Sequence, residues 1–528
     1  MKKLLLLLVL ALPFGAAAAP AGWLNIQQLG AKPDGKTKCT EVIKTAIAQA
    51  EKNGGGTIYF PAGEYLTGAI ALKSNITLHL EAGAVLKFSD NFDDYLPFVK
   101  MRWEGTVMNS FSPLFYAYEQ ENITIEGRGK IDGNGQNWWK EMFRIMIEIR
   151  DSGDVKSLNK YQKMWEEQNQ GLQTSDYYAR TMKLRFFRPP LFQTYECKNV
   201  RIEGVTIVNS PFWTVNPAFC DNVTVTGVTI NNPPSPNTDG INPTSCRNVH
   251  ISDCHISVGD DCITIKSGRD ADGRKWNRPC ENITITNCTM LSGHGGVVIG
   301  SEMSGSVRKV TISNCVFDGT DRGIRLKASR GRGGVVEEIR VSNIVMKNIK
   351  REAFVFNLFY DKNQPEEPVS ERTPTFRNIH ISNVTGSEVK QACLVLGINE
   401  MPVENLTFNN INIDADLGFE MNTARNIELH NVEVSTKLGA PFKAIDVEGL
   451  VLGNVKARTP LAQTPIVDLR NVKNAYIYNC SPLAATDIFA RISGENTERV
   501  VMKYNNFVNV QKPLEKGYGV KDTDVVVE

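Results

Sequence analysis

The chain lacks a net charge, and after its first twenty residues it lacks any long hydrophobic run. Lys and Arg total 59 against 58 for Asp and Glu, which gives a net charge of +1. No overall field therefore attracts nucleic acid or an anionic membrane. A transmembrane helix needs about 20 apolar residues in succession, and none is predicted. The hydrophobic content of 41% excludes wholesale disorder, so we expect a globular protein.

The first 21 residues differ from the rest. Lys2 and Lys3 precede an apolar run from Leu4 to Phe14, and small residues follow. This pattern is typical of a signal peptide. We expect residues 1–21 to be a signal peptide and residues 22–528 to be exported, to a periplasm or out of the cell.

The cysteines do not resemble a disulfide framework. There are eleven, an odd number, and their positions follow the repeat described next. We expect buried free thiols.

A short unit recurs along the chain. It reads Asn, apolar, polar, apolar, polar, Asn, apolar, and clear copies are "ENITITNC" (281–288), "RKVTISNC" (308–315), "RNIHISNV" (377–384), "RNIELHNV" (425–432) and "KNAYIYNC" (473–480). The average spacing of about 27 residues indicates a repeat architecture. The apolar residues alternate as in a β-strand that buries one face. Asn tolerates left-handed backbone and bonds to stacked copies of itself, which favours turns between coils.

These features predict an all-β fold, a single right-handed parallel β-helix. A propeller would need about 40 residues per blade and hairpin turns, which are not evident. Residues 40–52 have helical periodicity and are predicted to form a helix that caps the open first coil. A charged, aromatic stretch interrupts the repeat, and we place a helical insertion at about 136–185.

Four clusters depart from the repeat. They are "NTDG" (237–240), "VGDDCITIKSG" (258–268), "SGHGG" around His294, and "RGIRLKA" with Arg325 and Lys327. Asp239 and Asp260 lie one short coil apart, and Asp260 and His294 occupy the same position in successive units. Each cluster alone is compatible with a turn or a solvated surface. Like charges on neighbouring coils are unfavourable without a function or compensating cations, so together they indicate a catalytic site.

These four blocks, in this order, resemble the polygalacturonases of glycoside hydrolase family 28, as do "GAKPDG" and "GGGTIYFPAGEY" near the N-terminus. The resemblance covers most of residues 22–528. It implies a pectin-lyase-like β-helix and an inverting hydrolase that cleaves α-1,4 bonds to galacturonic acid in pectin, without a metal or other cofactor. The partner would be a pectic polysaccharide or oligogalacturonide, and a monomer is favoured.

The resemblance also assigns roles. Asp260 resembles the general acid, and Asp239 and Asp261 the carboxylates that hold and activate water. Inversion needs an acid and a base roughly 6.5 to 9.5 Å apart, and repulsion between carboxylates raises one pKa. Both aspartates of the pair must face outward, so a bend is predicted there. The remaining candidates are His294, which tunes the acid or holds substrate, and the substrate-binding residues Arg325, Lys327, Tyr360 and Asn237.

Two long connections favour attack on chain ends. The loop at 267–282 and the insertion after Gly135 both lie near the predicted cleft, and closing one end of it would make the enzyme exo-acting. Arg269, Arg274 and Lys275 are candidates for holding a terminal uronate.

Three other functions remain open. A rhamnogalacturonan or decorated-pectin hydrolase of the same family is the nearest. A pectate lyase would use calcium at an acidic cluster, which the three aspartates could imitate. A carbohydrate-binding β-helix without catalysis is the most distant.

Overall fold

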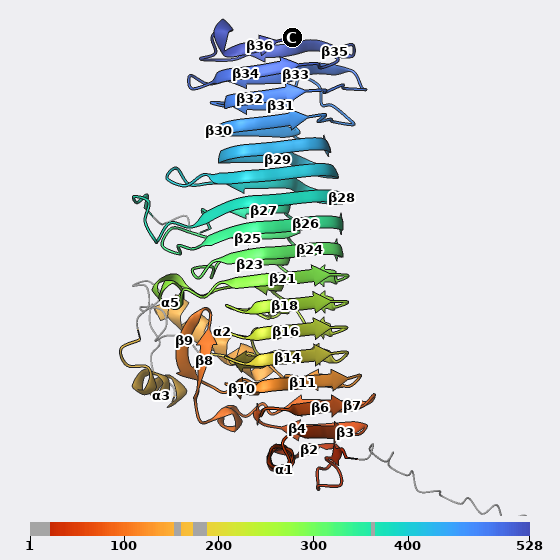
Figure 1. The fold of residues 1–528 in the computed structure, drawn as a ribbon, viewed down its shortest axis with the longest axis vertical. Coiled ribbons are helices and arrows are strands. Elements are labelled where there is room, and N and C mark those ends of the chain that lie inside the picture. Colours follow the sequence, from red (N-terminus) through yellow and green to blue (C-terminus); the bar gives the residue numbers. More distant parts are fainter. Residues whose placement is uncertain (1–21, 153–159, 173–186, 361–364) are drawn as a thin grey trace, which may run out of the picture.

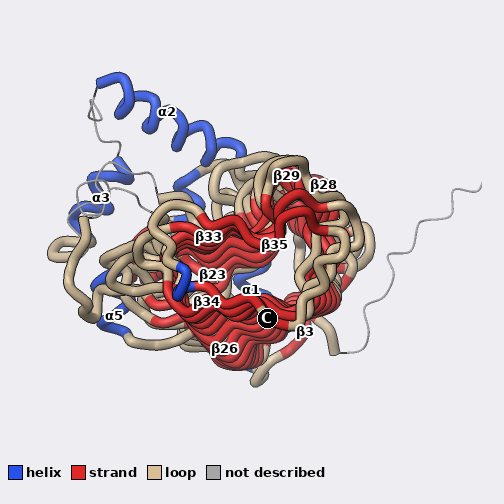
Figure 2. The backbone as a smooth tube through the Cα atoms, turned by 90° about the horizontal axis from the view of Figure 1, so that it is seen from above, coloured by secondary structure: helices blue, strands red, loops and turns tan. Residues whose placement is uncertain are grey.

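The computed structural model describes residues 22–152, 160–172, 187–360 and 365–528, and it forms a tall rod of stacked coils (Figure 1). The predicted signal peptide lies outside the described residues. Viewed along the rod, the strands surround a common axis, and α2 and α3 lie outside them (Figure 2). The predicted parallel β-helix is confirmed. No described helix has the length and apolar character needed to span a bilayer.

Three columns of parallel strands build the lower part of the rod. The first contains β3 (Gly56–Phe60), β6 (Ile76–Leu80), β11 (Glu121–Gly127), β14 (Lys198–Glu203), β16 (Asp221–Thr226), β18 (Arg247–Ser252) and β21 (Cys280–Thr286). The second contains β4 (Gly63–Thr67), β7 (Ala84–Phe88), β12 (Lys130–Asp132), β15 (Thr206–Val208), β17 (Thr229–Asn231), β19 (His255–Ser257) and β22 (Thr289–Ser292).

The third column carries the predicted site. It contains β5 (Ile70–Ala71), β10 (Phe115–Tyr118), β13 (Phe192–Tyr195), β20 (Asp261–Ile265), β23 (Gly295–Gly300), β25 (Ile324–Lys327) and β27 (Glu352–Asn357). Isolated bridges at Val215 and Ile241 continue it between β13 and β20. Residues of this column therefore stack on one face.

Longer strands continue around the bends in the upper part. They are β24 (Val307–Asp318), β26 (Val335–Lys347), β28 (Thr375–Leu396), β29 (Val403–Thr436) and β30 (Phe442–Gly453). The last coils contain β31 (Pro465–Arg470), β32 (Lys473–Tyr478), β33 (Thr486–Ser493), β34 (Glu498–Lys503), β35 (Val510–Lys516) and β36 (Val525–Val527). Near the other end, β1 (Leu24–Asn25) and β2 (Asp34–Lys38) pair with β3 and β4.

Identical positions of successive coils stack inside and at the turns. Ile283, Val310 and Ile339 are in register and fully buried, and each such side chain contributes roughly 1.5–3 kcal/mol. At the turns, Asn287 and Asn314 have positive φ, as predicted for left-handed Asn. All eleven cysteines are buried and none forms a disulfide, which confirms the prediction of core thiols.

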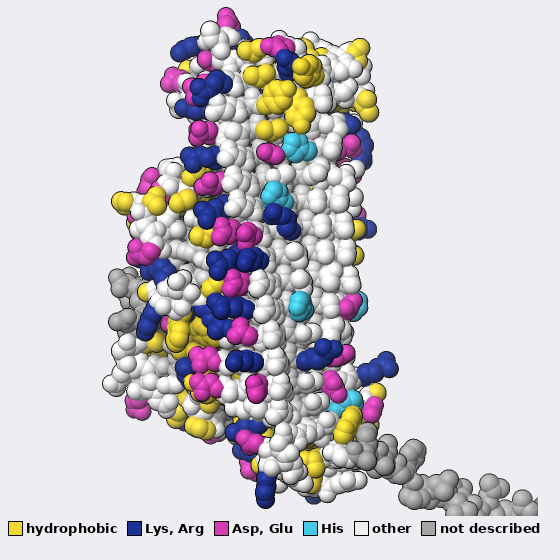
Figure 3. Space-filling model, in the orientation of Figure 1, with side chains coloured by type: hydrophobic (Ala, Val, Ile, Leu, Met, Phe, Trp, Pro, Cys, Tyr) yellow, Lys and Arg dark blue, Asp and Glu magenta, His cyan; other side chains and the backbone are white. Residues whose placement is uncertain are grey.

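The first column also presents a row of alternating charges, here called the charge ladder. In order along the rod it contains Glu121, Lys198, Asp221, Arg247, Glu281, Arg308, Glu337, Arg377, Glu404, Arg425, Glu448, Lys473 and Glu498. Glu281 lies 3.0 Å from Arg247 and 2.7 Å from Arg308. Figure 3 shows a column of alternating basic and acidic side chains along the rod. Each acid thus has a base on the neighbouring coil.

Helices and a hairpin complete the fold. Helix α1 (Thr40–Lys52) packs its apolar face on β3, β5 and β6, so the predicted capping helix is confirmed. In the insertion, α2 (Gln136–Ser152) and α3 (Lys160–Gln168) confirm the predicted helical character within its described residues. The antiparallel hairpin of β8 (Val99–Trp103) and β9 (Thr106–Ser110), and helix α5 (Asp270–Trp276), lie beside the third column.

Candidate active site

A bend in the chain turns the paired aspartates toward one cavity. The residues after β19 bend at Gly259 and Asp260, and β20 begins at Asp261. Both aspartates line the same cavity. The predicted bend is therefore present, and it replaces the alternation of a regular strand.

Backbone bonds place the candidate residues on adjoining coils. The His294 N–H donates to the carbonyl of Asp260 at 2.8 Å, so these residues occupy equivalent positions, as predicted. The Gly240 N–H donates to the carbonyl of Asp261. Asp239 therefore stacks beside Asp261, whereas the spacing of 21 residues had paired it with Asp260. The bridge between Ile241 and Ile263 has the same offset of 22 residues.

Three carboxylates converge at this point. One oxygen from each of Asp239, Asp260 and Asp261 lies within 4.8 Å of the others. Asp239 and Asp261 are buried, and the Asp260 side chain is 18% exposed toward the cavity. The cluster is tighter than the roughly 6.5 to 9.5 Å expected for an inverting pair. The stacking of the coils sets this separation. The distance between the carboxylates therefore does not by itself support an inverting mechanism.

Two cations hold the buried Asp261. Lys327 Nζ lies 2.8 Å from its Oδ2 and Arg325 Nη1 lies 3.7 Å from its Oδ1. Lys327 and Arg325 lie within about 5.5 Å of the Tyr360 ring centre. Three of the four candidate substrate-binding residues, Arg325, Lys327 and Tyr360, are thus brought together, with positive charge beside an aromatic ring.

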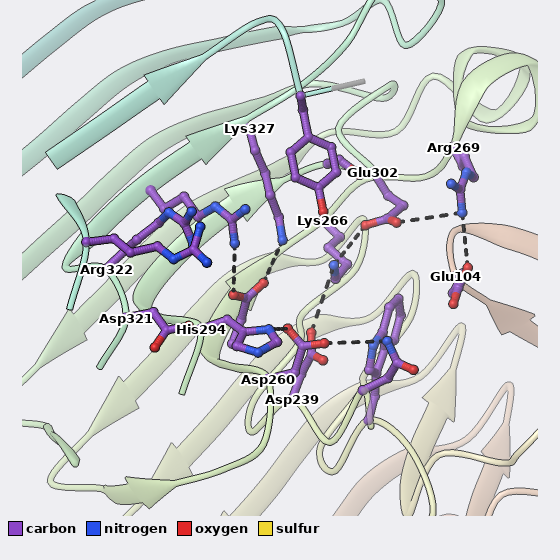
Figure 4. A pocket seen from close by; sticks show the side chains of 17 residues that line it. Glu104, Asp239, Asp260, Lys266, Arg269, His294, Glu302, Asp321, Arg322 and Lys327 are labelled. Atoms are coloured by element: carbon purple, nitrogen blue, oxygen red, sulfur yellow. Dashed lines mark hydrogen bonds and ion pairs between the residues drawn. The ribbon is translucent and has the colours of Figure 1, made fainter. Parts of the chain in front are cut away.

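Asp260 is held by a histidine and an amide. His294 Nδ1 lies 3.0 Å from Asp260 Oδ1, and Asn237 Nδ2 donates to Oδ2 at 3.4 Å. Asn237 is itself fixed by a bond from Arg188 Nη2 at 2.8 Å. All eight predicted site residues therefore line one cavity (Figure 4).

The carboxyl groups of the cluster differ in proton affinity. Burial and then the charge of Asp260 raise the pKa of Asp239 well above its ordinary value. Burial also raises the pKa of Asp260, but the His294 hydrogen bond and Lys327 outweigh this and lower it. The bond to Asp260 raises the pKa of His294. Repulsion does raise one carboxyl pKa, as expected, but in the free site it raises that of Asp239 rather than of the predicted acid, Asp260.

Sequence reasoning missed part of the cavity lining. The missed residues are Glu104, Trp213, Lys266, Ser301, Glu302, Asp321, Arg322 and Arg351. Lys266 lies in the "DDCITIKSG" block that had been singled out. Its importance was not visible because its partner Glu302 follows the next strand of the column.

The cavity has a volume of about 550 Å³ and is bounded on one side by Glu104 of the hairpin and by Arg269, which immediately precedes α5. Glu104 of the hairpin turn bonds to Arg269 at 3.1 Å, and the Arg269 N–H donates to the carbonyl of Gly105. No described residue of the insertion lines the cavity. Trp165 of α3 instead packs with the hairpin residues Met101 and Trp103 in one hydrophobic cluster. The described part of the insertion therefore supports the wall from behind.

The positive charge in the cluster comes from side chains. Lys327 and Arg325 contact Asp261, and Lys266 lies 4.0 Å from Asp239. A divalent cation among the three carboxylates would compete with these groups. These neighbouring cations, rather than the carboxylates themselves, disfavour a metal ion at the cluster.

Comparisons with known proteins agree with this geometry. The family model described as "Glycosyl hydrolases family 28" matches residues 168–436, and that described as "Rhamnogalacturonase A/epimerase, pectate lyase-like" matches residues 23–131. A probable polygalacturonase of Vitis vinifera is 30% identical over 414 residues, 76% of each chain. An endo-polygalacturonase of Pectobacterium parmentieri is 28% identical, covering 73% of this chain and 86% of that protein.

A solved structure is similar over most of its length. The hyperthermoactive exopolygalacturonase of Thermotoga maritima is 34% identical, with a TM-score of 0.66, over 78% of this chain and 92% of that one. The fold and the carboxylate site define a β-helical hydrolase. The chain belongs to the glycosyl hydrolases of family 28, the polygalacturonase family. The predicted enzyme class, a glycoside hydrolase, is confirmed, and membership implies a pectic substrate.

Proposed function

We propose that this enzyme removes galacturonic acid units from the ends of pectic galacturonan chains by hydrolysing α-1,4 bonds with inversion. The observation that carries the exo mode is the wall of Glu104 and Arg269 at one side of the cavity. An endo-acting enzyme needs a cleft through which a polymer passes at both ends. The exopolygalacturonase from Thermotoga maritima supports this proposal.

Each step of the reaction has a candidate residue. Asp260 is the most exposed of the three clustered carboxyls, and it donates a proton to the glycosidic oxygen as the bond to the anomeric carbon breaks. A water forms the new bond to that carbon, and its proton passes to Asp261, which Lys327 holds in place. Asp239 orients the same water. Protons balance, because one enters the cluster and one leaves it.

Asp260 must be protonated to act as the acid, whereas its lowered pKa favours the ionised form in the free site. His294 supplies the means, because it shares a proton with Asp260 across 3.0 Å. Transfer along this bond gives a neutral carboxyl and a neutral imidazole. His294 therefore maintains the acid rather than acting on water.

Arg325, Lys327 and Tyr360 form the binding site for the sugar carboxylate at the cleavage point. A planar guanidinium matches that anion, and the Tyr360 side chain is partly exposed beside it. A neutral sugar at this position would leave the guanidinium without its anion. This set favours galacturonan over rhamnogalacturonan.

The proposal is tested by incubating residues 22–528 with polygalacturonic acid and with rhamnogalacturonan, with and without chelator. Monomeric galacturonic acid from the first time points, insensitive to chelator and without ultraviolet absorbance, is expected. Proton NMR of the first product should show the inverted β anomer. Mixed oligomers would refute the exo mode, and products only from rhamnogalacturonan would refute the substrate. Unsaturated products lost with chelator would indicate a calcium-dependent lyase.

A further inference from the structure

A chain of alternating charges connects the cavity wall to Asp239. Glu104 lies 3.1 Å from Arg269, Arg269 lies 3.9 Å from Glu302, and Glu302 lies 2.8 Å from Lys266. Lys266 Nζ is in turn 4.0 Å from Asp239 Oδ2. Figure 4 shows these five side chains in succession across the cavity.

Lys266 is the central member, and it is almost inaccessible to solvent. The residue is 3% exposed, and its ammonium donates to Glu302 Oε2 and to the carbonyl of Gly300 at 3.3 Å. It also lies 4.7 Å from the centre of the Trp213 ring. Burial lowers its pKa, but Glu302 and Asp239 outweigh this and keep it charged. A buried ammonium is costly without such partners, so the site maintains this charge beside Asp239.

Asp239 depends on that charge. Its Oδ2 accepts bonds from the neutral groups Asn242 Nδ2 at 3.0 Å and Thr264 Oγ1 at 3.4 Å. The charged groups that influence it are Asp260, Asp261, Lys327 and Lys266. Two of these are acids, and Lys327 bonds directly to Asp261. Lys266 is therefore the cation that acts chiefly on Asp239.

We propose that Lys266 is a positioning residue that orients Asp239 and favours its ionised form, and that Glu302 limits how strongly it does so. This inference rests on the proposed function, in which Asp239 orients the attacking water. It also connects the wall to the reaction centre, because Glu302 contacts Arg269 of the wall. The opposing pKa effects on Asp239, upward from burial and downward from Lys266, support the inference.

Two substitutions of similar shape test it because they have opposite signs. K266M removes the cation, so Asp239 should bind its proton more tightly. E302Q removes the anion that offsets Lys266, so Asp239 should bind its proton less tightly. The matched control is E281Q, since Glu281 is also buried between two cations but lies on the charge ladder.

The direct readout is the titration of the Asp239 carboxyl by carbon-13 NMR, assigned by the signal that D239N removes. The midpoint should rise by about one pH unit in K266M, fall in E302Q and stay unchanged in E281Q. The acidic limb of kcat/KM should move in the same directions. In K266M, kcat should fall about tenfold or more, with KM changed less than about threefold.

Midpoints that move together, or that do not move, would overturn the inference and leave Lys266 as a structural ion pair. If K266M does not fold, the downward shift in E302Q against E281Q still decides. Absence of hydrolysis by the unmodified enzyme would refute the proposed function, whereas the NMR midpoints would still test the electrostatic effect of Lys266.

Discussion

The same coils carry two charged surfaces that follow opposite rules. On the charge ladder, acid and base alternate from coil to coil, so Glu281 lies between Arg247 and Arg308. In the third column, Asp239 stacks beside Asp261, and the compensating cations lie around this pair rather than between its members. Coil stacking fixes both spacings at roughly 4.8 Å. The difference indicates that the ladder serves the fold, whereas the like charges of the site serve chemistry.

The two surfaces also differ in solvent access. The ladder arginines beside Glu281 are more than 40% exposed, so water screens each pair and its contribution to stability is small. Asp239 and Asp261 are buried, so their charges interact strongly. The site therefore lowers stability locally, and the ladder is expected to add a little to it along the whole rod.

The largest predicted effect is the loss of the proposed acid. D260N keeps the shape of the side chain but cannot donate the proton, so kcat/KM should fall about 1,000-fold or more. Steady-state hydrolysis of polygalacturonic acid checks this. D221N makes the same change on the charge ladder and should keep activity within about twofold. Equal losses in both variants would show that the two surfaces do not differ in function.

A smaller effect is expected at the histidine that holds this acid. The pKa of His294 is raised, so the pair with Asp260 keeps a proton above the usual range of histidine, and activity falls only as that proton leaves. In H294Q the proton that the Asp260–His294 pair shares can be held only by the Asp260 carboxyl. The basic limb of kcat/KM should move to lower pH by about one unit, with kcat about tenfold lower.

The control for this prediction is H380Q, because His380 lies in β28 on the ladder face and does not line the cavity. Its pH profile should match that of the unmodified enzyme. An unchanged basic limb in H294Q would show that His294 does not hold the proton that the reaction requires.

Breaking the alternation of the ladder should cost stability without affecting activity. E281K would place three cations on successive coils, where like charges face each other directly. We expect this repulsion and the loss of two ion pairs to lower the free energy of unfolding by about 1–3 kcal/mol. The loss stays within this range because the neighbouring arginines can move into solvent. Urea denaturation measures it, and kcat/KM should stay within about twofold. A loss near zero would mean that the alternation of charges on the ladder does not contribute to the free energy of unfolding.

The fold was predictable because each coil repeats one pattern. Units such as "ENITITNC" and "RKVTISNC" show the strand, the turn Asn and the buried apolar residues, and the capping helix spans the predicted 40–52. Asp260 and His294 could be placed together because they stand at equivalent repeat positions, whereas the roles of the other site residues followed from the resemblance to family 28. The first residue of each repeat unit belongs to the charge ladder. The alternation of acid and base becomes visible only when the units are aligned coil by coil.

The remaining features depend on contacts that local sequence does not encode. The hairpin of β8 and β9 forms the wall through Glu104, and its partner Arg269 lies 165 residues away. Lys266 and Glu302 meet only when two coils stack. The lowered pKa of Asp260 follows from its distances to His294 and Lys327. Motifs therefore identify which residues gather, and packing decides which of them carries the proton.

The most direct test of the contrast between the two surfaces measures unfolding free energy and kcat/KM in D239N and E281Q. The raised pKa of Asp239 means that its stabilising contribution is present at low pH and is lost as the pH rises through that pKa. At pH 7, D239N should therefore be about 1 kcal/mol more stable, with a smaller gain near pH 4, and at least about 1,000-fold less active. E281Q should lose up to about 1 kcal/mol and keep its activity. A destabilised D239N, or an inactive E281Q, would contradict the account.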